Sequence, residues 1–272
     1  MATPIDASTL SLLRPTYLPS TDPESPAVQS TITALSLIPH VEGGYYALTD
    51  LAPTSIPSPY PPSPLSEATL AATGGPRPGF DPEQRLLSST IFYCLTPRRP
   101  QGSFHANRSR IVHTLHRGRG RYVLIHPDDG RVETFVVGQG IEKGERLQWV
   151  VEGGVYKASF LLPDVGGDGE EEQEQEESGG LLISETVVPG FEYADHEFLS
   201  LEGSRALLSA DVAAQLEWLV KKSETHADIM GRTKKKKENE ADQTGETAAS
   251  PALRCRPSRS GAISGHNSRI LN

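Results

Sequence analysis

The sequence has few cysteines, few aromatic residues and no long apolar run, and each of these absences excludes a class of protein. Its 272 residues include two cysteines, Cys94 and Cys255, which are too far apart to give a disulfide framework or a zinc-binding spacing. This usage favours a reducing compartment, the cytoplasm, with the nucleus as an alternative. No segment approaches the roughly 18 consecutive apolar residues of a membrane-spanning helix, so we expect no membrane partner. Residues 1–13 lack a charged region followed by an apolar one, which argues against a secretory signal.

The net charge of −9 is distributed unevenly along the chain. Residues 166–180 contain seven acidic residues and no basic one, which predicts a solvated loop. Residues 221–272 have an excess of basic residues, and their run of four lysines at 234–237 favours either solubility or nuclear import. Residues 98–121 contain seven arginines and no acid. Because alternation along strands would divide these arginines between two faces, they favour a solvated or anion-binding face over nucleic-acid binding.

Proline, glycine and polar residues are concentrated in a few stretches that delimit one domain. Residues 1–21 are rich in Ser, Thr and Pro and predict a disordered N-terminus. Residues 53–82 are dense in proline and predict a surface insertion or linker. We therefore expect a single domain over residues 22–220, with insertions at 53–82 and 166–180, and a disordered tail over residues 221–272.

Short strands dominate the rest of the sequence. A helix is expected to begin near Asp22 and to end before Pro39, and an amphipathic helix is expected over residues 206–220. Asp129-Gly130 between two apolar runs indicates a β-hairpin. The spacing of the strands predicts an all-β protein, an antiparallel sandwich or barrel. The expected strands are residues 87–95, 111–116, 122–126, 132–137, 147–151, 155–162 and 181–188.

Four motifs stand out in this region. They are residues 40–46 (HVEGGYY); Ser103-Phe104-His105 followed by His113, Gly118 and Arg121; residues 145–151 followed by Gly153 and Gly154; and residues 188–197 (VPGFEYADHE). The first resembles the segment PHPEGGYF, and the last resembles the segment PGFDFADFE, of a cupin family long catalogued as a domain of unknown function. The resemblance implies a double-stranded β-helix (jelly roll), usually dimeric, with a sugar-epimerase-like barrel that encloses a small-molecule pocket.

The resemblance also raises the question of a metal. Metal-binding cupins use two histidines and a glutamate on one strand pair, and a further histidine after the second motif. This chain has no acid near Ile111 and has Lys157 at the later position, so we predict no firmly bound cofactor. His113 and His116 are three residues apart and should point to opposite faces of a strand. A divalent metal held by His105 and His113 is the alternative.

Without a metal, the motifs supply the groups of an epimerase-type site. His105 or His113 would act as general base and Tyr156 or Tyr193 as acid. If residues 105–113 form a hairpin, the two imidazoles meet on the inner face of the barrel. The expected ligand-binding residues are Glu42, Tyr46, Arg108, Arg110, Arg121, Trp149, Phe191 and Asp195.

These residues leave three functions open. The first is binding, with isomerisation or epimerisation, of a small polar or anionic metabolite inside the barrel. The second is a metal-dependent oxygenase or isomerase that uses His105 and His113. The third is a non-catalytic dimeric scaffold that engages protein partners. Glu42 and Asp195 either orient a histidine or serve as turn and cap residues. We expect a homodimer, and no nucleic-acid partner.

Overall fold

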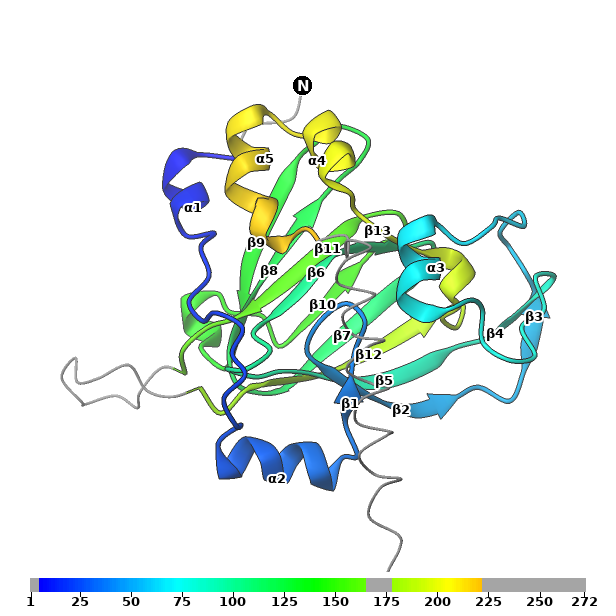
Figure 1. Cartoon of the computed structure of the whole chain (residues 1–272), viewed down its shortest axis with the longest axis horizontal. Helices are drawn as coiled ribbons and strands as arrows, with labels where there is room; N and C mark the ends of the chain where they lie inside the picture. Colours follow the sequence, from blue (N-terminus) through cyan, green and yellow to red (C-terminus); the bar gives the residue numbers. More distant parts are fainter. Residues whose placement is uncertain (1–4, 165–177, 222–272) are drawn as a thin grey trace, which may run out of the picture. The chain divides into compact units, whose positions relative to one another are not determined.

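Two antiparallel β-sheets form the centre of the structure (Figure 1). The computed structural model describes residues 5–164 and 178–221, which lie in the compact unit Met1–Ser223. The expectations for the acidic segment, apart from its end at residues 178–180, and for the tail beyond residue 221 lie outside the described residues. The six-stranded sheet has the order β1 (Ile38–Pro39), β2 (Tyr45–Leu51), β5 (Ser89–Leu95), β12 (Leu181–Val188), β7 (Arg110–Arg117) and β10 (Gln148–Val151). The five-stranded sheet has the order β13 (His196–Phe198), β6 (Gln101–Asn107), β11 (Tyr156–Leu161), β8 (Gly120–Ile125) and β9 (Val132–Val137).

Local sequence signals account for most of these strands. The hairpin predicted at Asp129-Gly130 joins β8 to β9, where Ile125 pairs with Val132. Gly130 has φ of 71°, a conformation that glycine adopts without steric cost. The all-β expectation is confirmed.

Side-chain alternation gives the five-stranded sheet two different apolar faces. Tyr122 and Leu124 belong to the inner cluster, which also contains Leu115 and Ile183 of the opposite sheet. Their neighbour Val123 belongs to an outer cluster. The inner cluster is therefore the core between the sheets, because successive side chains of a strand point to opposite faces.

Helices from the first and last parts of the described residues cover the outer face of the five-stranded sheet (Figure 1). They are α1 (Ala7–Ser11), α4 (Leu201–Leu207), α5 (Ala210–Leu216) and the 3-10 helix η3 (Glu217–Leu219). The structure differs here from the expected disordered N-terminus, because Leu13 is fully buried in the outer cluster. Burying one leucine side chain stabilises by about 1.5–3 kcal/mol, and together with the packing of Ile5 and Leu10 against the same cluster it helps to offset the cost of ordering this segment.

The remaining elements surround the barrel. Helix α2 (Pro26–Ala34) begins a few residues later than expected, because the Ser25 side chain caps it by accepting from the Val28 amide at 3.4 Å. The proline-dense stretch contains β3 (Ser55–Pro57), which pairs with β4 (Gln84–Leu86), and helix α3 (Glu67–Thr73). Two further 3-10 helices are η1 (Ile141–Lys143) and η2 (Tyr193–Asp195). No helix within the described residues is both long and apolar enough to span a membrane.

Candidate metal centre and ligand site

A tight turn between β1 and β2 places Glu42 against β6. Gly43 and Gly44 have φ of 118° and 62°, and a Cβ atom on Gly43 would lie 2.1 Å from the carbonyl oxygen of Gln101. The Glu42 carbonyl accepts from the Ser103 amide at 2.7 Å. The glycines thus allow the close approach that brings the Glu42 carboxylate to the inner side of the sheet.

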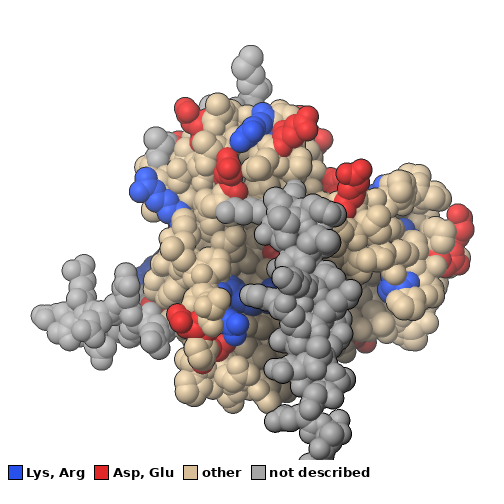
Figure 2. Space-filling model, in the orientation of Figure 1, with Lys and Arg blue, Asp and Glu red and all other residues tan. Residues whose placement is uncertain are grey.

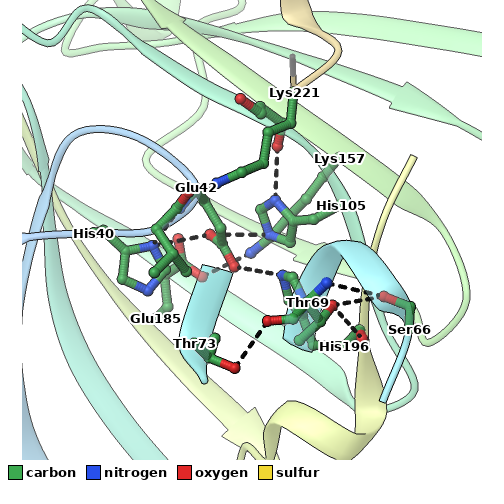
Figure 3. Close-up of polar contacts among 12 residues, drawn as sticks. His40, Glu42, Ser66, Thr69, Thr73, His105, Lys157, Glu185, His196 and Lys221 are labelled. Atoms are coloured by element: carbon green, nitrogen blue, oxygen red, sulfur yellow. Dashed lines mark hydrogen bonds and ion pairs between the residues drawn. The ribbon is translucent and has the colours of Figure 1, made fainter. Parts of the chain in front are cut away.

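Two histidines from distant parts of the sequence converge at this carboxylate (Figure 3). Nε2 of His105 lies 3.2 Å from Oε2 of Glu42, and Nε2 of His196 lies 3.1 Å from Oε1. All three residues are buried, and their ligating atoms lie within 4.8 Å of one another. Strands β6 and β13 supply the two histidines, whose rings stack with centroids 5.4 Å apart.

The hydrogen bond of His105 determines which of its two ring nitrogens faces the carboxylate as a lone pair. Nδ1 of His105 lies 2.8 Å from the carbonyl oxygen of Ser103, and it must donate because a carbonyl only accepts. Nε2 of the neutral His105 ring therefore carries no hydrogen, and this buried atom has no hydrogen-bond partner among the described residues. Nδ1 of His196 lies 3.2 Å from Oγ1 of Thr69 in helix α3.

Burial shifts the pKa values of this cluster. Desolvation lowers the pKa of His105 to about 3, and it also lowers the pKa of His40. Desolvation opposes ionisation of Glu42, but the surrounding imidazoles, including a hydrogen bond with His196, hold the pKa of its carboxyl well below the ordinary value. His40 accepts at Nδ1 from the Glu42 amide at 3.3 Å and packs edge-on against Tyr46 at 4.5 Å between ring centroids.

A second buried cluster lies between the two sheets. Nζ of Lys157, on β11, lies 2.7 Å from Oε2 of Glu185 and 3.0 Å from Nε2 of His113, both on the opposite sheet. The Lys157 ammonium donates, so Nε2 of His113 accepts and the ring is neutral. Burial is the main cause that lowers the pKa of His113, and the charge of Lys157 lowers it further. Trp149 stacks on His113 with centroids 5.0 Å apart.

The Glu42, His105 and His196 side chains fit a divalent metal ion, whereas His113 does not extend this set. Two imidazole nitrogens and one carboxylate leave open positions for a ligand. The Ser103 carbonyl and the Thr69 hydroxyl contact the outer ring nitrogens, as the hydrogen-bond partners of metal-ligating histidines usually do. A cation beside Nε2 of His113 would instead meet the Lys157 ammonium.

The expected hairpin between His105 and His113 is wrong. Strand β6 pairs with β11 and β13, and β7 pairs with β10 and β12, so the two histidines lie on opposing sheets. The link between them turns from one sheet to the other. His116 is exposed while His113 is fully buried, as the three-residue spacing predicts.

Of the other predicted residues, Tyr156 and Asp195 lie away from these clusters, whereas Phe191 contacts His196. Tyr156 packs against the outer cluster and bonds Glu197, so it is on the opposite face of β11 from Lys157. Asp195 makes a buried two-pronged ion pair with Arg85, at 2.6 and 3.0 Å. Phe191 lies edge-on to His196, with ring centroids 6.0 Å apart.

The three arginines expected to bind an anion have partners outside the barrel core. Arg108 donates to the Pro61 carbonyl, Arg110 pairs with Glu152 at 2.9 Å, and Arg121 lies 3.5 Å from Oγ1 of Thr134. Figure 2 shows basic and acidic side chains interspersed on the visible face, without a continuous patch of one sign.

Sequence reasoning missed four residues of these clusters. They are His40, Lys157, Glu185 and His196. Two of them carried a signal, since Lys157 replaces an expected histidine and His196 replaces the last phenylalanine of PGFDFADFE. For His40 the only signal was its place in the motif of residues 40–46, and for Glu185 it was its place in the expected strand of residues 181–188.

Comparisons with known proteins agree with this architecture. The sequence model of the family described as "Cupin superfamily (DUF985)" matches residues 29–199. An uncharacterized protein of Saccharomyces cerevisiae is 41% identical over 199 residues, which cover 72% of this chain and 88% of the yeast protein.

Two solved structures share the fold at 23% identity. The hypothetical protein from Leishmania major aligns with a TM-score of 0.54 over 71% of this chain and 98% of its own. The protein SO0799 from Shewanella oneidensis aligns with a TM-score of 0.53 over 74% of this chain and all of its own. These likenesses concern the fold alone.

Proposed function

This chain belongs to the cupin superfamily, in the family designated DUF985, and on that premise we propose that it binds a small polar or anionic molecule at a divalent metal ion inside the barrel. Glu42, His105 and His196 would hold the ion. One observation carries the proposal. Nε2 of His105 and Oε2 of Glu42 lie 3.2 Å apart, and each directs a lone pair at the other without an intervening proton.

Two facing acceptors are unfavourable in a buried site unless a cation or proton lies between them. Protonation of His105 is disfavoured by its burial. A metal ion resolves the contact, since it accepts both lone pairs and replaces the hydration that burial removes. Thr69 and Ser103 then orient the two rings.

The reaction class that we propose is isomerisation or epimerisation. A divalent ion in this place would polarise a carbonyl or hydroxyl oxygen of the ligand as a Lewis acid. Such a reaction needs a group that moves a proton beside that oxygen. Lys157 and His113 are buried next to this site and are the candidates, because neither is a member of the proposed ligand set.

One observation favours an oxygenase as the second candidate. Two histidines and one carboxylate with open positions are the ligand set of many non-haem Fe(II) oxygenases. The identity of the metal that co-purifies separates the two candidates, because Zn²⁺ has no redox chemistry and Fe²⁺ does.

Metal titration of protein purified without a histidine tag tests the proposal. After chelator treatment, we expect the protein to bind about one Co²⁺ or Mn²⁺ per chain, as measured by elemental analysis and by the visible spectrum of Co²⁺. Glu42→Gln and His196→Phe should lose this binding, and the exposed His116→Gln should retain it. Stoichiometric binding that survives both site variants would place the metal elsewhere and overturn the proposal.

Two further expectations are part of the proposal. The family resemblance supports a homodimer, which light scattering after size-exclusion chromatography tests. The cysteine content supports a cytoplasmic location, with the nucleus as an alternative, which fluorescence microscopy of the tagged full chain tests. A dimer that binds neither metal nor small molecule would favour the scaffold function.

A further inference from the structure

Lys157 is a buried ammonium with one donor to spare. Its side chain is 4% exposed, and an ammonium has three N–H donors. The structure gives it two acceptors, Oε2 of Glu185 and Nε2 of His113, and no third among the described residues. A buried donor without a partner is unfavourable, so the third N–H is suited to an oxygen of a bound molecule.

The strand register places this ammonium beside the proposed metal ligands. Lys157 on β11 lies directly opposite His105 on β6 in an antiparallel pair. Side chains at such positions point to the same face, with Cβ atoms about 4.5–5.5 Å apart. Figure 3 shows Lys157 passing behind His105 toward Glu185. A molecule of a few atoms can therefore contact both an ion at His105 and the Lys157 ammonium.

Hydrogen-bond geometry fixes the charge of the surrounding histidines. His113 accepts from the Lys157 ammonium, and His40 accepts from the Glu42 amide, so both rings are neutral. His105 and His196 are neutral when they ligate a metal through Nε2.

The charges around the site then do not cancel. Among the buried side chains, Glu42 and Glu185 are two carboxylates and Lys157 is one ammonium, which leaves one negative charge. The ammonium of Lys221, which is only partly buried, donates to the Val41 carbonyl at the edge of the site and is not part of this count. The other buried acids are each paired with an arginine elsewhere in the fold. These pairs are Arg119–Glu145, Arg77–Glu192 and Arg85–Asp195. A divalent ion turns the single negative charge into a single positive one.

We infer that the ligand of the metal-loaded barrel is a small monoanion, such as a carboxylate, with one oxygen on the metal and another accepting from Lys157. The inference rests on the proposed metal site and specifies its ligand. A monoanion neutralises the remaining positive charge, whose burial would otherwise be unfavourable. Metal and anion should therefore strengthen each other's binding, and this coupling is reciprocal.

The test uses the full chain loaded with Co²⁺ and a panel of formate, acetate, glycolate and pyruvate, with neutral ethylene glycol for comparison. Calorimetry and the Co²⁺ spectrum report binding. We expect at least one anion to bind more tightly than ethylene glycol, and at least about tenfold more weakly after the metal is removed. Lys157→Met should weaken anion binding by about tenfold or more, as expected for one charge-assisted hydrogen bond, with Co²⁺ still bound.

Lys157→Met leaves the Glu185 carboxylate buried without its partner, so a second variant is needed. Lys157→Met/Glu185→Gln removes one charge of each sign and keeps the balance while the donor is still lost. The exposed Lys143→Met is the matched control and should bind as the wild type does.

The outcomes separate this inference from the proposed function. Absence of Co²⁺ binding at Glu42, His105 and His196 would overturn both. If Co²⁺ binds normally, either of two results on anion binding would overturn the inference and leave the proposed function standing. In the first, no anion of the panel binds more tightly than ethylene glycol. In the second, the double variant binds the anion as tightly as the wild type does.

Discussion

Nε2 of His105 lies 3.2 Å from Oε2 of Glu42, while Nδ1 of the same ring donates to the carbonyl of Ser103 at 2.8 Å. Ser103 also donates its amide to the Glu42 carbonyl. One residue of β6 thus fixes both partners, because its amide holds the Glu42 turn and its carbonyl selects the tautomer of His105. This arrangement aims two lone pairs at one point inside the barrel.

Thr69→Val should weaken metal binding without unfolding the protein. Oγ1 of Thr69 lies 3.2 Å from Nδ1 of His196, and valine keeps the shape but removes the hydrogen bond. Loss of such an outer partner typically costs 10–100-fold in metal affinity. Co²⁺ titration measures the change. Thr73→Val is the control on the same helix, since the Thr73 hydroxyl bonds only backbone groups among the described residues.

Gly43→Ala should destabilise the fold and displace Glu42. The φ of 118° is strained for alanine, and the new Cβ would lie 2.1 Å from the Gln101 carbonyl oxygen. We expect a loss of about 1–3 kcal/mol from the strained backbone alone, together with weaker Co²⁺ binding. Gly144 also has a positive φ, of 81°, but a Cβ atom added there would have no atom within 4 Å. Gly144→Ala should therefore lose less free energy of unfolding, as measured in urea. Equal losses in both variants would contradict the steric argument.

Asp195→Asn should cost stability because it breaks a buried ion pair. The side chains of Arg85 and Asp195 are each 2% exposed and 2.6 Å apart, and removing one charge of such a pair costs about 3–5 kcal/mol. Glu152→Gln breaks the exposed pair with Arg110 and should change stability by at most about 1 kcal/mol. Urea unfolding of both variants measures the difference. Similarly small losses of unfolding free energy in both variants would show that the ion pair of Asp195 does not stabilise the fold.

The metal-free protein should lose stability as the pH falls below the ordinary histidine pKa of 6.5. Burial lowers the pKa of His113, so the unfolded chain binds a proton that the folded chain does not. His113→Gln removes this difference, and its melting temperature should fall less between about pH 7 and about pH 5 than that of the wild type. The exposed His116→Gln should retain the wild-type slope. A steeper fall of the melting temperature with pH in His113→Gln than in the wild type would contradict the lowered pKa of His113 as the cause.

Local signals predicted much of the fold and part of the site. Alternating apolar residues and the Asp129-Gly130 turn gave the strands and one hairpin, because both depend on neighbours in the sequence. The motifs drew attention to Glu42 and His105, which the structure brings together at 3.2 Å. The N-terminal segment and the proline-dense insertion have polar, proline-rich sequences, yet Leu13 and Thr69 are fully buried through contacts with distant residues.

The sequence by itself determined the all-β class, the turns and the alternation of side chains along each strand. The tertiary structure decided which alternate positions face inward, and it placed Lys157 inside and Tyr156 outside, contrary to the expected role of Tyr156. Only the tertiary structure decided which strands became neighbours. It separated His105 from His113 by placing β6 and β7 in different sheets, and it brought His196 to Glu42 across more than half of the chain. The physical reason is that side-chain direction follows from local backbone geometry, whereas strand partners follow from closing the two sheets over a common core.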